Sequence, residues 1–573
     1  MAHRFAVPAT GLALILGLLA GCQQDATPPP PTTGWVPGTL RFGAHADFKS
    51  LDPALANDTD SIPFVRTMCQ SLLDYDDGVN LVPLLAESMP DVSADGMTYT
   101  FHLRKGVRFS NGRELTSEDF VYSWTRVLDP ATVSPGQSYV KDLIAGAKEY
   151  SDWRSVEDKQ KAHQDLTAED QQVPRADAVS GLSAPDARRF QVKLTHADQT
   201  FPYVIAMTYF APVPREEIEK YPQEERKDQF TAHPVGTGPF VLKEWRRSLR
   251  LRLERDPHYW DAEHAPALQA LEVRFGLDDL TKQMMFERGE LDLMNRIPSA
   301  AYVRLKHDPR WQPCFEKLVF NGAFYLWINC EMEPFAGEKG RLVRRALRYA
   351  IDKERIAQVS NDRYVPAKGV VPPQMPGYKS QVLGCPYDPK AAKRLLAEAG
   401  YADGVPDSLA LWVSNEESSG ERIAEVIQQD LKAVGFRKVE VNAVNFDVYQ
   451  AMTGKHKTAP LCYGGWYQDY PDPSDFLYQL FSSNSITDSD CNNLSFYHSD
   501  KADELMDQAG KEHDPAKRME QYAEAEKRIV EEDAAVVPVV DVQEIWLRQT
   551  WVTGFHIHPV WLVKYDKLSI TPP

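Results

Sequence analysis

The sequence predicts an α/β protein, and two stretches carry most of that prediction. Residues 409–413 form a short apolar strand pattern, residues 421–434 place apolar side chains on one helical face, and residues 439–444 again alternate like a strand. A strand, a helix and a strand in that order form a parallel βαβ unit. Gly435 follows the helical pattern directly and marks its end.

The second stretch is an apolar strand pattern at 459–465 that leads into a polar, proline-containing loop at 466–473. In open α/β sheets, ligands gather beyond the carboxyl ends of the strands. The loop at 466–473 is therefore the first place where the sequence predicts a binding site.

Other segments follow the same mixture of strands and helices. Residues 240–254 alternate as a β-hairpin, and Thr116 with Asp119 resembles a capping box that opens a helix. Asp388 is a suitable N-cap for a helix that ends at Gly400. The polar stretch 150–177 has almost no apolar periodicity and is interpreted as an exposed helical insertion or loop.

The N-terminus has the pattern of an export signal. An apolar run at 11–20 is too short for a membrane-spanning helix, which needs about 20 residues, but it suits a signal peptide. The run ends in Leu-Ala-Gly-Cys at residues 19–22, which resembles the lipobox of bacterial lipoproteins. We therefore expect residues 1–22 to be the signal and lipidation site, with a lipid on Cys22, and residues 23–37 to be a proline-rich linker.

Composition excludes several classes of function. The net charge of -18 argues against a nucleic-acid partner, which needs a basic surface. The sequence contains no hydrolase, zinc-protease or phosphate-loop motif, so we expect neither enzymatic activity nor a cofactor or metal. An oxidising compartment permits disulfides, and we expect some of the remaining six cysteines to be bridged and others to be buried free thiols: Cys69, Cys314, Cys330, Cys385, Cys462 and Cys491.

Several short motifs, in this order and spacing, resemble the peptide-binding branch of the ABC-importer solute receptors, the dipeptide/oligopeptide/nickel class. The motifs lie at residues 50–53, 236–240, 255–260, 343–352, 387–390 and 465–473. The resemblance implies a periplasmic-binding-protein-like fold of two α/β lobes joined by a hinge, with an extra subdomain on the first lobe. It implies a discontinuous lobe I at 38–80, 201–322 and 539–573, the extra subdomain at 81–200, and lobe II at 323–538.

The same resemblance implies a function without chemistry. A solute receptor of this kind captures a peptide between its lobes, closes around it, and presents it to the permease of an ABC transporter. The chain would then be a monomer outside the cytoplasm, in the periplasm or at the cell surface, held to a membrane by its lipid alone. Peptides with a free N-terminus are the expected ligands.

Asp469 is the leading candidate for ligand contact, because relatives use an aspartate at this place to pair with the α-amino group of the peptide. A carboxylate forms strong charge-assisted hydrogen bonds with an ammonium. Gly465, Trp466 and Tyr467 resemble the strand that pairs with the ligand backbone, a mode that does not depend on the ligand's side chains. Phe48 resembles the partner strand on the other side of the ligand.

Some residues are expected to be structural, and some questions stay open. Asp472 and Asp475 are interpreted as helix caps that add negative potential, and Arg344, Arg345 and Arg348 as a solvated face. The residue that pairs with the ligand carboxylate is not located, because residues 414–420 are acidic and Tyr463 stands where some relatives offer a basic residue. A receptor for nickel or another metal complex, and a peptide sensor without transport, remain alternatives.

Overall fold

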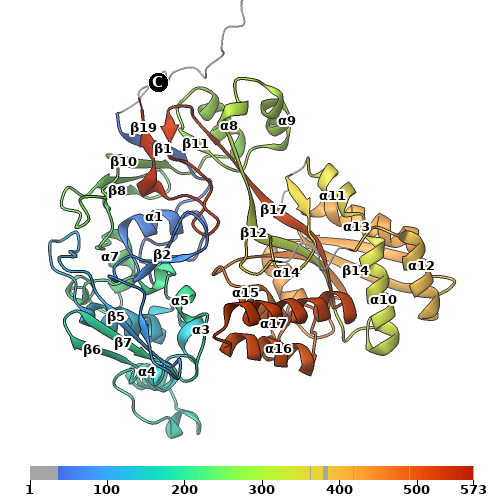
Figure 1. The fold of residues 1–573 in the computed structure, drawn as a ribbon, viewed down its shortest axis with the longest axis horizontal. Helices are drawn as coiled ribbons and strands as arrows, with labels where there is room; N and C mark the ends of the chain where they lie inside the picture. Colours follow the sequence, from blue (N-terminus) through green and yellow to red (C-terminus); the bar gives the residue numbers. More distant parts are fainter. Residues whose placement is uncertain (1–36, 362, 379–384, 417–418, 490, 572–573) are drawn as a thin grey trace, which may run out of the picture.

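A computed structural model describes residues 37–361, 363–378, 385–416, 419–489 and 491–571. The expected signal peptide, Cys22 and nearly all of the linker lie outside the described residues. Figure 1 shows two bodies joined by two long strands, β12 (Phe315–Ile328) and β17 (Val536–Arg548). The two strands pair antiparallel along almost their whole length, with a register shift between Val319 and Ala323. We call the two bodies the first and the second lobe.

The first lobe is built on a four-stranded sheet. Its strands, in spatial order, are β1 (Thr39–Gly43), β10 (Ala270–Arg274), β9 (Arg250–Arg255) and β8 (Phe240–Arg246). Strands β8 and β9 form the hairpin that the sequence predicts. Trp551 and Tyr565 are buried in the core beneath this sheet, so the C-terminal segment packs against the first lobe.

A smaller body within the first lobe has its own sheet and core. The sheet runs β4 (Asp91–Val92), β5 (Thr98–His102), β7 (Arg189–Lys193), β6 (Leu182–Asp186). It is accompanied by α2 (Ser117–Leu128), α3 (Gln137–Val140), α4 (Ala147–Lys161) and α5 (Phe201–Val204). Helix α2 begins with the predicted capping box of Thr116 and Asp119. Near the hinge, the first lobe also carries α8 (Asp279–Glu287), β11 (Leu293–Met294) and α9 (Ser299–His307).

The second lobe contains the predicted βαβ unit. Strand β14 (Val405–Ser414) pairs parallel with β15 (Phe436–Val444), and α13 (Gly420–Val434) connects them and ends at Gly435. Strand β16 (Leu461–Tyr467) lies between β14 and the hinge strand β12. The helices around this sheet are α10 (Gly337–Ala350), α11 (Lys353–Val359), α12 (Pro389–Glu398), α14 (Phe446–Thr453), α15 (Ser474–Phe481), α16 (Asp500–Lys511) and α17 (Pro515–Lys527).

This arrangement supports a division of the chain that we propose as its domain structure. Lobe I would comprise 38–80, 201–322 and 539–573, with the extra subdomain at 81–200, and lobe II would comprise 323–538. The hinge strands β12 and β17 would then each pass from one lobe to the other, which restricts the relative movement of the lobes to bending at two places.

Two expectations about individual side chains are wrong. All six described cysteines are free thiols, although disulfides were expected for some. They belong to separate elements and cores, and burial raises the pKa of Cys69 and Cys462 above the ordinary thiol value, so these thiols are poor nucleophiles.

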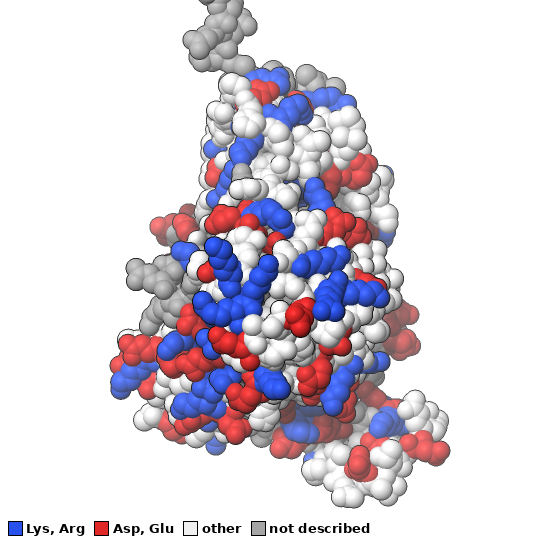
Figure 2. Space-filling model, turned by 90° about the vertical axis from the view of Figure 1, so that its right-hand side faces the viewer, with Lys and Arg blue, Asp and Glu red and all other residues white. Residues whose placement is uncertain are grey.

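The arginines of α10 also differ from expectation. Figure 2 shows Lys and Arg side chains gathered on the outer face of the second lobe, with Asp and Glu among them. Arg344 and Arg348 are nevertheless buried, and only Arg345 is partly exposed. The guanidinium of Arg344 donates to the carbonyl oxygens of Phe335 and Asp533, so it fixes the start of α10 to the end of the π-helical turn after α17.

Glu526 on α17 is a buried acid in the interior of the second lobe. Its carboxyl group accepts the backbone N–H groups of Val370 (2.7 Å) and Val371 (2.9 Å). Burial raises the pKa of Glu526 to about 7 from its ordinary value of 4.5. The unfolded chain therefore loses this proton at a lower pH than the folded protein does, and stability falls as pH rises between these two values.

Glu526→Gln should reduce the pH dependence of unfolding. The glutamine keeps an acceptor oxygen for Val370 and Val371 but does not ionise. From pH 5 to pH 8, we expect the free energy of unfolding of the wild type to fall relative to the variant by on the order of 3 kcal/mol. Chemical denaturation at several pH values measures this difference. Glu524→Gln, at an exposed position of the same helix, is the control. Equal pH slopes for wild type and Glu526→Gln would contradict the account.

Candidate functional site

Strand β16 has one edge that its neighbour β14 covers only in part. Residues Leu461 to Tyr463 pair with β14, which ends one residue later at Ser414. On its other side, β16 pairs with β12 as far as Tyr467. Beyond Tyr463, β14 no longer accompanies β16.

The hydrogen bonds of β16 fix which residues point to that edge. Gln468 donates its backbone N–H to Asn321 (2.9 Å), and Asn329 donates to Pro460 (3.1 Å). In an antiparallel pair, alternate residues bond to the same neighbour. Trp466 therefore directs its backbone groups to β12, whereas Gly465 directs its N–H and C=O to the edge that β14 leaves. Gly465 is exposed, and a Cβ there would lie only 2.8 Å from the ring of Phe324.

Asp469 follows β16 and is held by a second aspartate. Asp475, at the start of α15, is fully buried, and its Oδ2 accepts the backbone N–H of Asp469 (3.0 Å) and the indole N–H of Trp466 (3.3 Å). The other oxygen of Asp475 has no hydrogen-bond partner among the described residues. Burial raises the pKa of Asp475, and the nearby carboxyl group of Asp469 raises it further. Two carboxyl groups in such an environment favour a cation beside them.

The first lobe contributes tyrosines to the same place. The phenol of Tyr139, from α3, hydrogen-bonds with the carboxyl group of Asp469. Burial raises the pKa of Asp469, and this hydrogen bond opposes the shift. The ring of Tyr470 meets the ring of Tyr139 edge-on at 6.4 Å and is buried in the core of the extra subdomain beside Tyr209. Residues of both lobes therefore surround Asp469.

A buried ion pair fixes the loop that carries Asp469. Asp472 and Arg518 of α17 form two hydrogen bonds, of 2.6 and 2.9 Å, and their side chains are 1% and 8% exposed. Asp472 also accepts the backbone N–H of Ser474 at the start of α15 (3.0 Å). The Nε of Arg518 donates to the carbonyl of Ala509 at the end of α16 (3.2 Å). Arg518 thus joins the Asp469 loop to both α16 and α17.

The sequence-predicted residues fall into two groups. Gly465, Trp466, Tyr467 and Asp469 lie together, as their sequence spacing implies, with Trp466 half-buried and Tyr467 exposed. The ring of Phe48, in contrast, is 1% exposed and packs against Phe64 and Phe275 in the first-lobe core.

The expected role of Phe48 therefore needs correction. Strand β1 ends at Gly43, so Phe48 does not belong to a strand, and its ring has no access to a ligand. Only the backbone of this segment remains available for the contact that the sequence predicts.

The structure adds residues that the sequence did not indicate. Tyr139 lies 330 residues before Asp469 in the chain and belongs to a different body, and Arg518 lies on a helix with no motif of its own. A partner for a ligand carboxylate is still not located. Tyr463 is 3% exposed and stacks on Phe324 (5.5 Å between ring centroids), which excludes it from that role.

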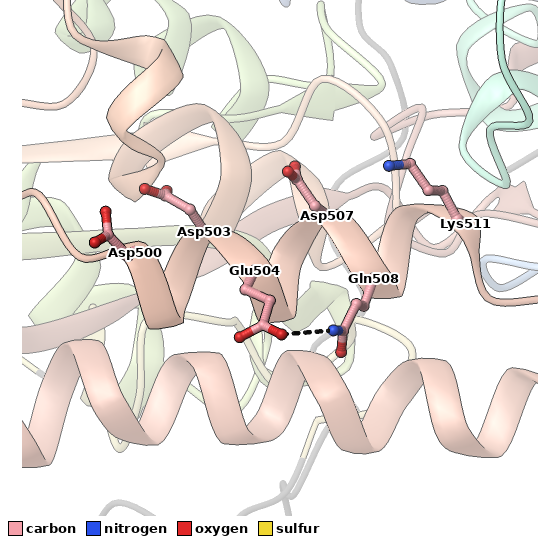
Figure 3. A pocket seen from close by; sticks show the side chains of 6 residues that line it. All are labelled: Asp500, Asp503, Glu504, Asp507, Gln508 and Lys511. Atoms are coloured by element: carbon pink, nitrogen blue, oxygen red, sulfur yellow. Dashed lines mark hydrogen bonds between the residues drawn. The ribbon is translucent and has the colours of Figure 1, made fainter.

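An acidic recess elsewhere on the second lobe does not resemble a ligand site. Figure 3 shows that its side chains project from one helix, α16, and that Glu504 bonds with Gln508. Across the described parts of the chain, His, Cys, Asp and Glu nowhere form a group of three or more suited to a metal ion. No described helix is both long and apolar enough to cross a membrane.

Comparison with known proteins decides the family. The model of the bacterial extracellular solute-binding proteins, family 5 (middle part), matches residues 80–488, which is more than half of the chain. The chain belongs to this family. Its members are non-enzymatic solute-binding proteins that work outside the cytoplasm, as the sequence predicts for this chain.

Relatives of this family 5 protein resemble it over nearly its whole length. The glutathione-binding protein GsiB of Escherichia coli is 27% identical over 97% of each chain. Di/tripeptide-binding protein 2 of Pseudomonas aeruginosa is 28% identical over 86% of each chain. The periplasmic binding protein DppA of Helicobacter pylori, solved with the peptide STSA, has a TM-score of 0.71 and 26% identity, covering 93% of this chain and 98% of that one. The predicted two-lobe α/β fold is thereby confirmed.

Arg518→Met should destabilise the second lobe of this solute-binding protein strongly. The change leaves the carboxylate of Asp472 buried without a partner, which typically costs about 3–5 kcal/mol. Denaturant unfolding measures the loss. Arg528→Met is the matched control, because Arg528 forms a partly exposed ion pair with Glu532, worth about 0–1 kcal/mol. Losses of similar size in the two variants would show that the Asp472 pair does not have this role.

Proposed function

We propose that this protein captures short peptides between its two lobes by pairing their free α-ammonium with Asp469. The observation that carries this proposal is the arrangement around Asp469. Two carboxyl groups, those of Asp469 and Asp475, lie close together in a buried environment, and the phenol of Tyr139 adds a hydrogen-bonding group. A peptide ammonium would supply the positive charge that this group of residues lacks.

The edge of β16 offers a second set of contacts. A ligand in extended conformation could pair its backbone with the N–H and C=O of Gly465. Such bonds use only the main chain, so they would hold peptides of different sequence. The close approach of Phe324 to Gly465 leaves no room for a side chain on that residue, which keeps the strand accessible.

Closure would follow from the position of the site. Asp469 lies on the second lobe and Tyr139 on the first, so a ligand that contacts both is bound better when the lobes are together. This difference in affinity shifts the protein towards the closed form. A closed, loaded receptor that delivers its peptide to an ABC importer is the activity that we propose, and the names of the relatives support it.

Glutathione is a second candidate ligand. It is a tripeptide-like thiol with a free amino group, and the glutathione-binding relative matches the chain over almost its full length. The di/tripeptide-binding relative is about as similar. Calorimetry with trialanine, dialanine and glutathione separates these ligands. A metal complex would bind without the need for a free amino group, and a sensor would bind peptides without supporting their uptake.

Asp469→Asn should weaken the binding of free peptides. The change removes the negative charge but keeps the size of the side chain, and a hydrogen bond to a charged group contributes about 1.5–3 kcal/mol, equivalent to roughly 10- to 150-fold in Kd. Isothermal titration with trialanine measures the effect. Asp500→Asn, on the exposed start of α16, is the control.

The same titration with N-acetyl-trialanine tests the role of the ammonium. The acetylated peptide should bind the wild type as weakly as trialanine binds Asp469→Asn. Equal affinity of the wild type for the free and the acetylated peptide would refute the proposed pairing.

We further propose that a lipid on Cys22 anchors the receptor to a membrane. The apolar run at 11–20 and the Leu-Ala-Gly-Cys ending support this, as does the proline-rich linker. A tether would raise the effective concentration of the receptor near its transporter. The residue after the cysteine, Gln23, does not indicate which bilayer carries the anchor.

Cys22→Ser should release the protein from membranes. The full-length chain and the variant are expressed in a bacterium, and the cells are fractionated. The wild type should sediment with the membranes, and the variant should not. Membrane association that persists in the variant would rule out anchoring through Cys22.

A further inference from the structure

A second contact between the lobes lies away from Asp469. The backbone N–H of Gln199, in the extra subdomain, donates to the carbonyl of Gly510 at the end of α16 (3.2 Å). The side-chain amide of Gln199 bonds to Nδ1 of His513, in the turn between α16 and α17 (2.9 Å). His513 also lies against Gly96, where a Cβ would approach its ring to 2.9 Å.

Both sides of this contact are stiffened by local hydrogen bonds. On the first lobe, Tyr99 donates to the carbonyl of Asp198 (3.1 Å), and the carboxylate of Asp198 accepts the backbone N–H and the hydroxyl of Thr200. On the second lobe, Asp514 caps α17 by accepting the N–H groups of Ala516 and Lys517. Neither loop needs to be ordered when the lobes meet, so little conformational entropy opposes the contact.

The contact is mechanically joined to the proposed ligand site. Arg518 binds the carbonyl of Ala509, next to Gly510, and also the carboxylate of Asp472, in the Asp469 loop. The turn that carries His513 and the loop that carries Asp469 therefore move together. Figure 1 shows α16 and α17 beside α3, at the end of the second lobe that lies away from the crossing of β12 and β17. A contact far from the hinge resists opening most effectively.

We propose that Gln199 and His513 form a latch that stabilises the closed arrangement of the lobes without touching the ligand. The inference rests on the proposed function, because it assigns the extra subdomain a part in ligand capture. The latch would raise the affinity for all ligands that bind the closed form by the same factor. It would do so by enlarging the fraction of molecules that are already closed.

Gln199→Ala removes the side-chain bond and leaves the backbone bond to Gly510 in place. One hydrogen bond of this kind corresponds to a change in affinity of roughly two- to tenfold. We expect the Kd of trialanine and the Kd of glutathione to rise by the same factor, mainly through faster dissociation. His513→Ala should have the same effect, and the double variant should bind no more weakly than either single variant. Gln164→Ala, at an exposed position of the same subdomain, is the control.

A measurement without ligand separates the latch from the proposed function. Fluorescent labels on the two lobes report their separation by energy transfer in the full chain. Both single variants should show a larger fraction of separated lobes than the wild type and Gln164→Ala. This result would support the latch even if neither trialanine nor glutathione binds, in which case the proposed function fails by itself. Unchanged lobe separation in Gln199→Ala and His513→Ala would overturn the latch, as would weakening that affects one ligand only.

Discussion

The buried ion pair of Asp472 and Arg518 is the interaction on which the binding end of the second lobe depends. It fixes the loop after β16, so that Asp469 stands at a defined place, and it ties the same loop to the ends of α16 and α17. Buried pairs of this kind contribute little net stability compared with apolar packing, but breaking one is costly. Their value here lies in position, because one arginine holds together two segments that both face the first lobe.

Electrostatics explains how such a site can prefer a peptide. The protein as a whole is strongly acidic, yet a specific interaction requires carboxyl groups that water does not screen. Asp469 and Asp475 meet this condition because they are close together and shielded by tyrosines from both lobes. The empty site keeps their proton affinity high, and an ammonium would replace the protons. Ligand binding and lobe closure would then depend on the same group of residues.

The sequence could predict the local parts of this arrangement and not the long-range ones. The βαβ unit of 405–444 and the cap of α2 follow from side-chain periodicity and hydrogen-bonding groups within a few residues. The cluster of Gly465 to Asp469 could be found because its members are adjacent in the chain. Tyr139 could not, because its contact with Asp469 depends on how two separately folded bodies meet. The aromatic pattern around Phe48 suits a core as well as a ligand wall, and burial decides between them.

A crystal structure of the protein with trialanine tests the central claim most directly. The account predicts closed lobes, with the amino nitrogen of the peptide within hydrogen-bonding distance of the carboxylate of Asp469 and with the peptide backbone paired to Gly465. A peptide bound in the reverse direction, with its amino group away from Asp469, would contradict the account, as would a peptide bound outside the region between the lobes.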